Sequence, residues 1–126
     1  MKRFAVVGVL VLALSAGVDA IGDLTQTRPD RVPADSRTDI VFEVRSERYR
    51  PGLHAAADGL WGACAGTTGR SLIVDPGIVE VSPGRFRLSV EPGLGEHARR
   101  RLVGCLEDLT IERVKGVVVS VDLVRA

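Results

Sequence analysis

The stretch that decides the predicted fold is IVEVSPGRFRLSVE, residues 78–91. Residues 78–81 are strand-like, and in 86–91 the apolar residues Phe86, Leu88 and Val90 alternate with polar ones, which is the pattern of a β-strand with one buried face. Between the halves, Pro83 and Gly84 are residues that a tight turn prefers. We therefore predict a β-hairpin with strands over 78–81 and 86–91. A helix-first alternative, without a hairpin over 72–91, fits this turn sequence less well.

The hairpin's first strand is predicted to be irregular. Residues 72–74 are apolar and extend the strand towards the N-terminus, but Asp75-Pro76-Gly77 interrupts them. Proline has no N–H to donate to a strand ladder, so we expect a bulge or a break at this point.

On both sides of the hairpin the apolar spacing changes to that of an α-helix. Residues 51–65 place one apolar stripe on a helix, with Pro51 suited to the first turn and Gly66 to the position after the end. Residues 95–109 give a second helix with one apolar stripe. The stripe of the first helix consists of Leu53, Ala56, Ala57, Leu60, Trp61 and Cys64, and that of the second of Ala98, Leu102, Cys105, Leu106 and Leu109.

Alternating segments at 38–45 and 116–125 complete the pattern with an outer strand at each end. The order β-α-β-β-α-β predicts an α+β fold of the ferredoxin-like type: a four-stranded antiparallel sheet with two helices on one face. In the last strand, the alternation predicts that Val117, Val119, Val121 and Leu123 face inward. By the same parity, Val41, Val118 and Val124 face outward and form an exposed apolar patch.

The N-terminus predicts export. Lys2 and Arg3 precede an uncharged, almost wholly apolar run from Phe4 to Val18, which is typical of a signal sequence. Counted on to Gly22, the run approaches the ~20 residues of a membrane-spanning helix. Basic residues before the run place the N-terminus in the cytoplasm and the remainder outside.

This interpretation divides the chain into three parts. Residues 1–22 form an N-terminal hydrophobic helix that acts as a signal anchor, holding the protein in the cell membrane through residues 4–22. Residues 23–37, polar and containing Pro29 and Pro33, form a flexible linker. Residues 38–126 form the extracytoplasmic domain. The alternative is a signal peptide cleaved near Ala20, which yields a secreted protein.

Cys64 and Cys105 are the two cysteines of the chain, and both lie on predicted apolar helix faces. In an oxidising compartment such a pair favours a disulfide, and the alternative is that both are small buried hydrophobic residues. Centred antiparallel helices would leave the two out of register, so a bond requires staggered or splayed helices. Redox catalysis needs a closely spaced pair, and zinc needs further ligands at a spacing that His54 and His97 do not provide. We predict no metal and no cofactor.

The best candidate for a ligand site is the segment RSERYRPGLH, residues 45–54. It brings Arg45, Arg48, Arg50 and His54 to the start of the first helix, where free backbone N–H groups favour an anion. The alternative is a solvated loop whose arginines pair with nearby acidic residues. A phosphate cradle would need a glycine-rich sequence, which is missing here.

Two further motifs have simple structural explanations. Gly93-x-Gly95-x-x-Ala98 resembles part of a dinucleotide fingerprint, but its strand belongs to an antiparallel hairpin, so we interpret the glycines as loop and N-cap residues. The run Arg99-Arg100-Arg101 is predicted to lie on the outer face of the second helix. It could contact anionic lipid, although a solubilising surface is the simpler interpretation.

Composition narrows the function without identifying it. A net charge of +1 argues against a nucleic-acid binder. No catalytic motif is recognisable, so we interpret the chain as a membrane-tethered binding or assembly module and not as an enzyme. Its partner would be another protein or a second copy of the chain, bound through the sheet. The alternative is a small hydrolase or transferase that acts on a phosphorylated or acidic molecule at residues 45–54.

Overall fold

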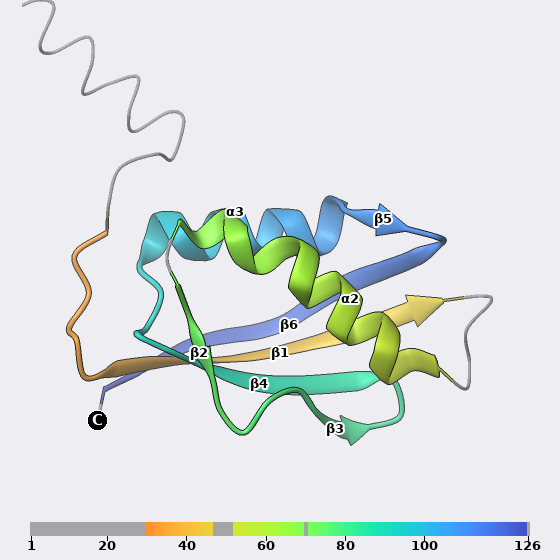
Figure 1. Ribbon diagram of the computed structural model, residues 1–126, viewed down its shortest axis with the longest axis horizontal. Coiled ribbons are helices and arrows are strands. Elements are labelled where there is room, and N and C mark those ends of the chain that lie inside the picture. Colours follow the sequence, from red (N-terminus) through yellow and green to blue (C-terminus); the bar gives the residue numbers. More distant parts are fainter. Residues whose placement is uncertain (1–29, 47–51, 70, 126) are drawn as a thin grey trace, which may run out of the picture.

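The computed structural model describes residues 30–46, 52–69 and 71–125. They form an α+β fold in which a curled antiparallel sheet carries two helices on one face (Figure 1). The predicted N-terminal hydrophobic helix lies outside the described residues. The strands are β1 (Ser36–Ser46), β2 (Ile73–Val74), β3 (Val79–Ser82), β4 (Arg85–Glu91), β5 (Thr110–Ile111) and β6 (Val114–Arg125). The helices are α2 (Leu53–Ala65), the short 3-10 turn η2 (Gly66–Thr68) and α3 (Glu96–Asp108).

The sheet is built around β1. Its strand order is β2-β4-β1-β6-β5, and β3 also pairs with β4. β1 is antiparallel to both of its neighbours, β4 and β6. β2 and β3 share the outer edge of β4 and are separated by residues 75–78. The predicted hairpin is therefore present, and the predicted break falls at Asp75-Pro76.

The hydrophobic core lies between the sheet and the helices. The period-two pattern places Ile40, Phe42 and Val44 of β1 inward, and each is at most 4% exposed. Phe86 of β4 lies beside Phe42, with ring centroids 6.1 Å apart. From the helices, the core receives Ala57, Leu60, Trp61, Cys64, Ala98, Leu102 and Leu106. Both predicted helix stripes thus face the sheet.

The prediction for the side-chain directions of β6 was wrong in part. The register shifts between Val41 and Phe42 of β1, so that Val41 pairs with Ser120 and Phe42 with Val118. The extra residue, Val119, forms a β-bulge. A bulge shifts the alternation of inward and outward side chains on one side of it relative to the other, so the residues before Val119 face the opposite way from the prediction. Consequently Val118 packs against the core, whereas Val119 is 48% exposed.

The end of α2 also differs from the prediction. Gly66 keeps a helical backbone and begins η2, and the left-handed residue that ends this segment is Gly69, with φ of 71°. Arg101 of α3 donates hydrogen bonds to the carbonyl oxygens of Thr67, at 2.8 Å, and Thr68, at 3.2 Å. A guanidinium at the C-terminal end of a helix satisfies free carbonyl groups. Arg101 therefore faces inward, unlike the outward direction predicted for the arginine run.

The start of α3 is capped by a residue from before β1. The carboxylate of Asp30 accepts hydrogen bonds from the backbone N–H groups of His97, at 3.2 Å, and Ala98, at 2.8 Å. Gly95 makes this possible, because a Cβ atom there would lie 2.2 Å from the Cβ of Asp30. Asp30 lies within the segment 23–37 that was predicted to be a linker.

Replacing Asp30 by alanine should destabilise the domain by about 1 kcal/mol, within the range of about 0.5–2 kcal/mol for losing a helix cap. Urea unfolding followed by circular dichroism measures the change. Asp35→Ala is the matched control, since Asp35 is exposed in the same segment. Equal midpoints for the Asp30 variant and the wild type would contradict the capping role.

Candidate functional site

The two cysteines lie together between the helices. The Sγ atoms of Cys64 and Cys105 are 2.03 Å apart, which is disulfide-bonding distance, and their Cα atoms are 5.7 Å apart. Cys64 is fully buried. The pair joins the last turn of α2 to α3, so it connects the two elements that cover the sheet.

Centred antiparallel helices would leave Cys64 and Cys105 out of register, but α2 and α3 cross at an angle. α2 runs obliquely, so that only its C-terminal end and η2 meet α3, while its N-terminal end lies beside the β3–β4 turn (Figure 1). The hydrogen bonds from Arg101 of α3 to Thr67 and Thr68 of η2 belong to this same contact region. The helices are therefore splayed, which is one of the two arrangements that the disulfide prediction required.

The predicted anion site is described for two of its four residues. Arg45 lies at the end of β1 with a side chain that is 69% exposed, and it contacts Glu43 at 3.4 Å. His54, in the first turn of α2, lies 3.1 Å from Asp58 through Nδ1 and 3.1 Å from the carbonyl oxygen of Ile78 through Nε2. Arg48 and Arg50 lie outside the described residues. Arg45 and His54 thus each contact other groups of this chain, which fits the solvated-loop alternative.

Glu43 is the centre of the charge cluster on the open face of the sheet. It accepts hydrogen bonds from Arg85, on the neighbouring strand β4, and contacts Arg45. The hydrogen bond from Arg85, followed by that from Arg45, lowers the pKa of Glu43 below its usual value of 4.5. Asp39 repeats the pattern further along β1, with Arg37, Arg87 and Ser89 as partners. The face predicted to carry an apolar patch therefore carries ion pairs along β1.

Replacing Glu43 by glutamine should remove a pH-dependent contribution to stability. Because the folded-state pKa is lowered, the ionised carboxylate stabilises the fold above the usual value of 4.5, and this contribution disappears as the pH falls through the folded-state pKa. The difference in unfolding free energy between wild type and Glu43→Gln should be constant near neutral pH and vanish in acid. Urea titrations over a pH series measure it, with Glu91→Gln on β4 as the control. A difference that persists unchanged in acid would contradict the ionic origin.

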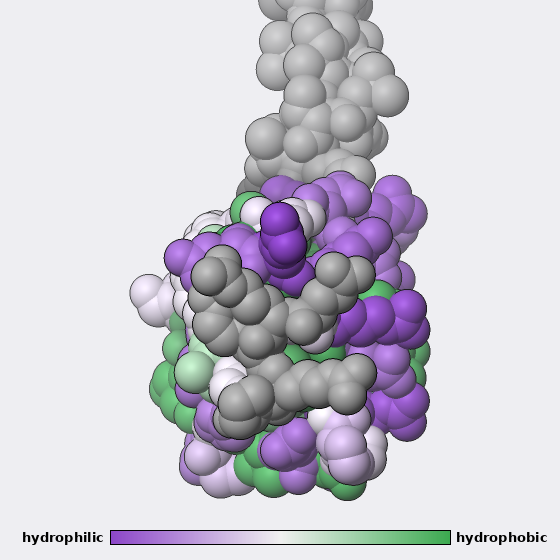
Figure 2. All heavy atoms as spheres, turned by 90° about the vertical axis from the view of Figure 1, so that its right-hand side faces the viewer, coloured by the Kyte–Doolittle hydropathy of each residue, from purple (hydrophilic) through white to green (hydrophobic). Residues whose placement is uncertain are grey.

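An open hollow of about 780 Å³ lies at the end of the molecule next to Arg45. It lies between the end of β1, the β3–β4 turn and the β5–β6 turn, and Arg113 is its second basic residue. Figure 2 looks onto this end and shows hydrophilic residues at its top and right and hydrophobic residues at its left and lower margins. Arg45 and Arg113 give the described part of the hollow a positive charge.

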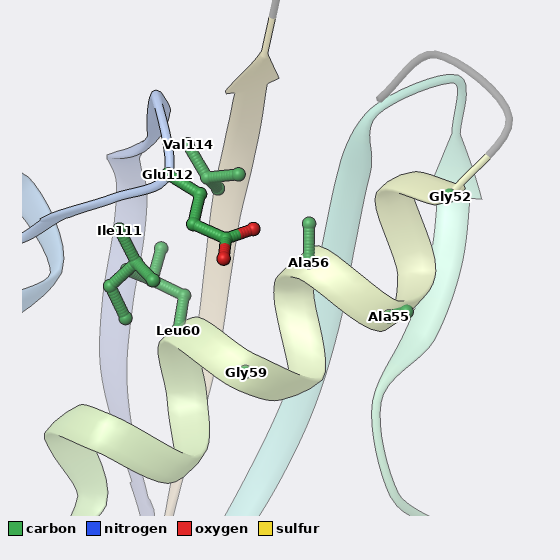
Figure 3. Close-up of a pocket in the computed structure, with 8 residues that line it drawn as sticks. All are labelled: Gly52, Ala55, Ala56, Gly59, Leu60, Ile111, Glu112 and Val114. Atoms are coloured by element: carbon green, nitrogen blue, oxygen red, sulfur yellow. The ribbon is translucent and has the colours of Figure 1, made fainter. Parts of the chain in front are cut away.

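A narrower, apolar groove of about 300 Å³ separates α2 from the β5–β6 turn. Figure 3 shows Ala56 and Leu60 on one side of the groove and Ile111 and Val114 on the other, with the carboxylate of Glu112 extending over the gap. Small residues, among them Gly52 just before α2 and Gly59 within it, leave this space open. The groove exists because α2 diverges from α3 towards its N-terminus.

The capping contacts of two residues were not predicted from the sequence. Asp30 caps the start of α3 and Arg101 caps the end of η2, and neither contact carries a local sequence signal because each partner is distant in the chain. Within the described residues, no group of three or more His, Cys, Asp or Glu side chains is arranged to hold a metal ion. Among the described helices, none combines the length and hydrophobicity of a membrane span. The predicted span over residues 4–22 lies outside the described residues.

Comparison with known proteins found no matching family model, no similar curated protein and no similar solved structure.

Proposed function

We propose that this protein is a membrane-tethered binding or assembly module whose folded domain lies outside the cytoplasm. Residues 4–22 would anchor it as a single span, and cleavage near Ala20 would instead release it as a secreted protein. The observation that carries the proposal is the Cys64–Cys105 pair at bonding distance. Disulfides persist in oxidising compartments, which is where the basic and apolar N-terminal sequence would direct the chain.

The proposed fold is ferredoxin-like in its finer details. If β2 and β3 are counted as one strand broken at Asp75-Pro76, the chain order becomes β-α-β-β-α-β. The order of the strands in the sheet, with β1 and β4 at the centre and β6 outside β1, supports this interpretation. β5 is then a short addition to the start of β6.

A binding role is supported by apolar side chains at the edges of the sheet. Val79 and Val81 of β3 are 46% and 52% exposed, and Ile73 of β2 is 67% exposed. On the opposite edge, Val119 and Leu123 of β6 are 48% and 49% exposed. Exposed apolar edges are typical of strands that pair with another chain.

Cell fractionation of the full-length protein tests the location. We expect the wild-type chain in the membrane fraction, resistant to carbonate extraction, with an intact mass that includes residues 1–22. Leu12→Arg should prevent insertion, because an arginine at the centre of a span costs about 2.5–3.5 kcal/mol. Leu24→Arg, outside the apolar run, is the matched control.

Two results would change the proposal. A mature N-terminus at Ile21 in the extracytoplasmic fraction would replace the anchored form by the secreted one. Wild-type protein found full-length in the soluble cytosolic fraction would overturn the proposal.

A further inference from the structure

Asp30 is held at the start of α3. Its carboxylate accepts hydrogen bonds from the backbone N–H groups of His97, at 3.2 Å, and Ala98, at 2.8 Å. In the sequence, the seven residues 23–29 separate Asp30 from Gly22, the last residue of the proposed anchor. A chain of this length spans at most about 25 Å even when it is fully extended. In the anchored protein, the start of α3 therefore lies close to the membrane surface.

We call the end of the domain that contains the start of α3 the proximal end. It also contains the start of β1 and the end of β6 (Figure 1). The β3–β4 and β5–β6 turns lie at the opposite end, beyond the 11 residues of β1. An extended strand of this length measures roughly 36 Å. The proximal end is thus the part of the domain that an anchored chain holds next to the lipid.

The part of the proximal end around α3 carries two arginines whose charges are not balanced. Glu96 forms an i,i+4 ion pair with Arg100, and the carboxylate of Asp30 is engaged by the backbone of α3. Arg31 and Arg99 are exposed, and neither side chain has a hydrogen bond or ion pair within residues 30–46, 52–69 and 71–125. This part of the surface therefore offers positive charge to an outside partner.

An exposed apolar side chain lies near Arg99. Leu123 of β6 is 49% exposed. Together with Arg99, Leu94 and Val121 among others, it lines a hollow of about 190 Å³. A leucine beside a basic residue is a combination typical of surfaces that bind at the boundary between lipid and water.

The open face of the sheet differs from this at the same end. Arg37 and Arg125 line a hollow of about 250 Å³ together with Asp35 and Glu91, so the positive and negative charges around it are equal. Because the open face offers no net charge here, the part around α3 is the one that favours an anionic surface.

We propose that the proximal end rests on the outer surface of the membrane, with Arg31 and Arg99 on phosphate groups of anionic lipids and Leu123 at the interface. This inference deepens the proposed function and rests on its membrane anchor. Guanidinium groups bind phosphate through paired hydrogen bonds, and each basic residue near an anionic bilayer favours the bound position by about five-fold. The hollow beside Arg45 and Arg113 then faces away from the membrane, where a partner can reach it.

The test uses the full-length protein in lipid nanodiscs that contain a gadolinium-chelating lipid, and NMR measures how strongly each backbone amide signal is broadened. The bilayer is phosphatidylcholine, alone or mixed with the anionic lipid phosphatidylglycerol. In the mixed bilayer we expect strong broadening for residues 94–99 and 121–124 and little for the turn 111–114. Without the anionic lipid, the broadening at 94–99 should weaken.

Charge reversal identifies the residues responsible. The double variant Arg31→Glu/Arg99→Glu should lose most of the broadening at 94–99 in the mixed bilayer, because two attractive contacts become repulsive. The matched control is Arg113→Glu/Lys115→Glu, which reverses two exposed charges at the opposite end and should keep the wild-type pattern. Since Arg31 and Arg99 are exposed, their double variant should retain the urea midpoint of the wild type.

Three results would overturn the inference: strongest broadening at 111–114, equal broadening in both bilayers, or a pattern that is indifferent to Arg31→Glu/Arg99→Glu. Co-elution of the protein with the nanodiscs tests the anchor separately. Protein that elutes without nanodiscs would overturn both the inference and the anchored form of the proposed function. Inserted protein without the expected pattern would contradict only the inference.

Discussion

Gly116→Ala is expected to destabilise the domain by about 3 kcal/mol, the upper end of the usual range of about 1–3 kcal/mol for an overpacked core. A Cβ at this position would lie 2.5 Å from the carbonyl oxygen of Leu106 and 2.7 Å from Cδ2 of Leu60. The nearer atom belongs to the backbone of α3, so the clash cannot be relieved by turning a side chain. Both the helix end and β6 would have to move. Urea unfolding, followed by circular dichroism, measures the loss.

Gly62→Ala is the matched control for this prediction. Gly62 lies within α2, and a Cβ added there meets no atom within 4 Å. Alanine costs less backbone entropy than glycine in a helix, so this change should stabilise the domain by about 0.5–1 kcal/mol. If both variants unfolded at the urea midpoint of the wild type, α3 would not pack on β6 as described.

Replacing Cys64 and Cys105 together by alanine is expected to cost roughly 2–4 kcal/mol, the usual contribution of a disulfide. The pair links positions 41 residues apart, so its loss releases a long loop in the unfolded chain. The double replacement also removes a covalent link between α2 and α3, so that their contact then depends on the hydrogen bonds between Arg101 and η2. The urea midpoint of the double variant, compared with that of the wild type, gives the size of the effect.

Reduction provides an independent control for the cysteine prediction. Wild-type protein unfolded and refolded with a phosphine reductant should show the stability of the alanine double variant, and the variant itself should not respond. Wild-type stability that is unchanged by complete reduction would show that the two thiols only pack together and are not bonded.

The parts of the fold that depend on local periodicity were predictable from the sequence. The alternation around Pro83-Gly84 indicated the hairpin, and the stripes containing Cys64 and Cys105 indicated two helices that cover the sheet. Each pattern indicates which face of one helix or strand is buried, and this face can be identified without knowing the distant residues that pack on it. The break at Asp75-Pro76 was predictable for the same reason, since proline acts on its own strand.

Features that depend on distant partners were not predictable. The bulge at Val119 depends on how β6 pairs with β1. Because of this one extra residue, Val118 faces the core and not the solvent as predicted. Asp30 caps a helix that begins far along the chain, so no local signal indicated its capping role. The contact of His54 with the carbonyl oxygen of Ile78 had no local signal either, because Ile78 lies 24 residues further along the chain.

The exported, cross-linked state of the domain is the central claim, and one measurement tests it most directly. Cells that produce the full-length protein are lysed in denaturant with excess N-ethylmaleimide and no reductant, and the intact mass of the protein is then determined. The account predicts a mass with no added maleimide, because Cys64 and Cys105 are bonded to each other. Protein that carries two maleimide groups would have held both cysteines as free thiols in the cell, and it would contradict the account.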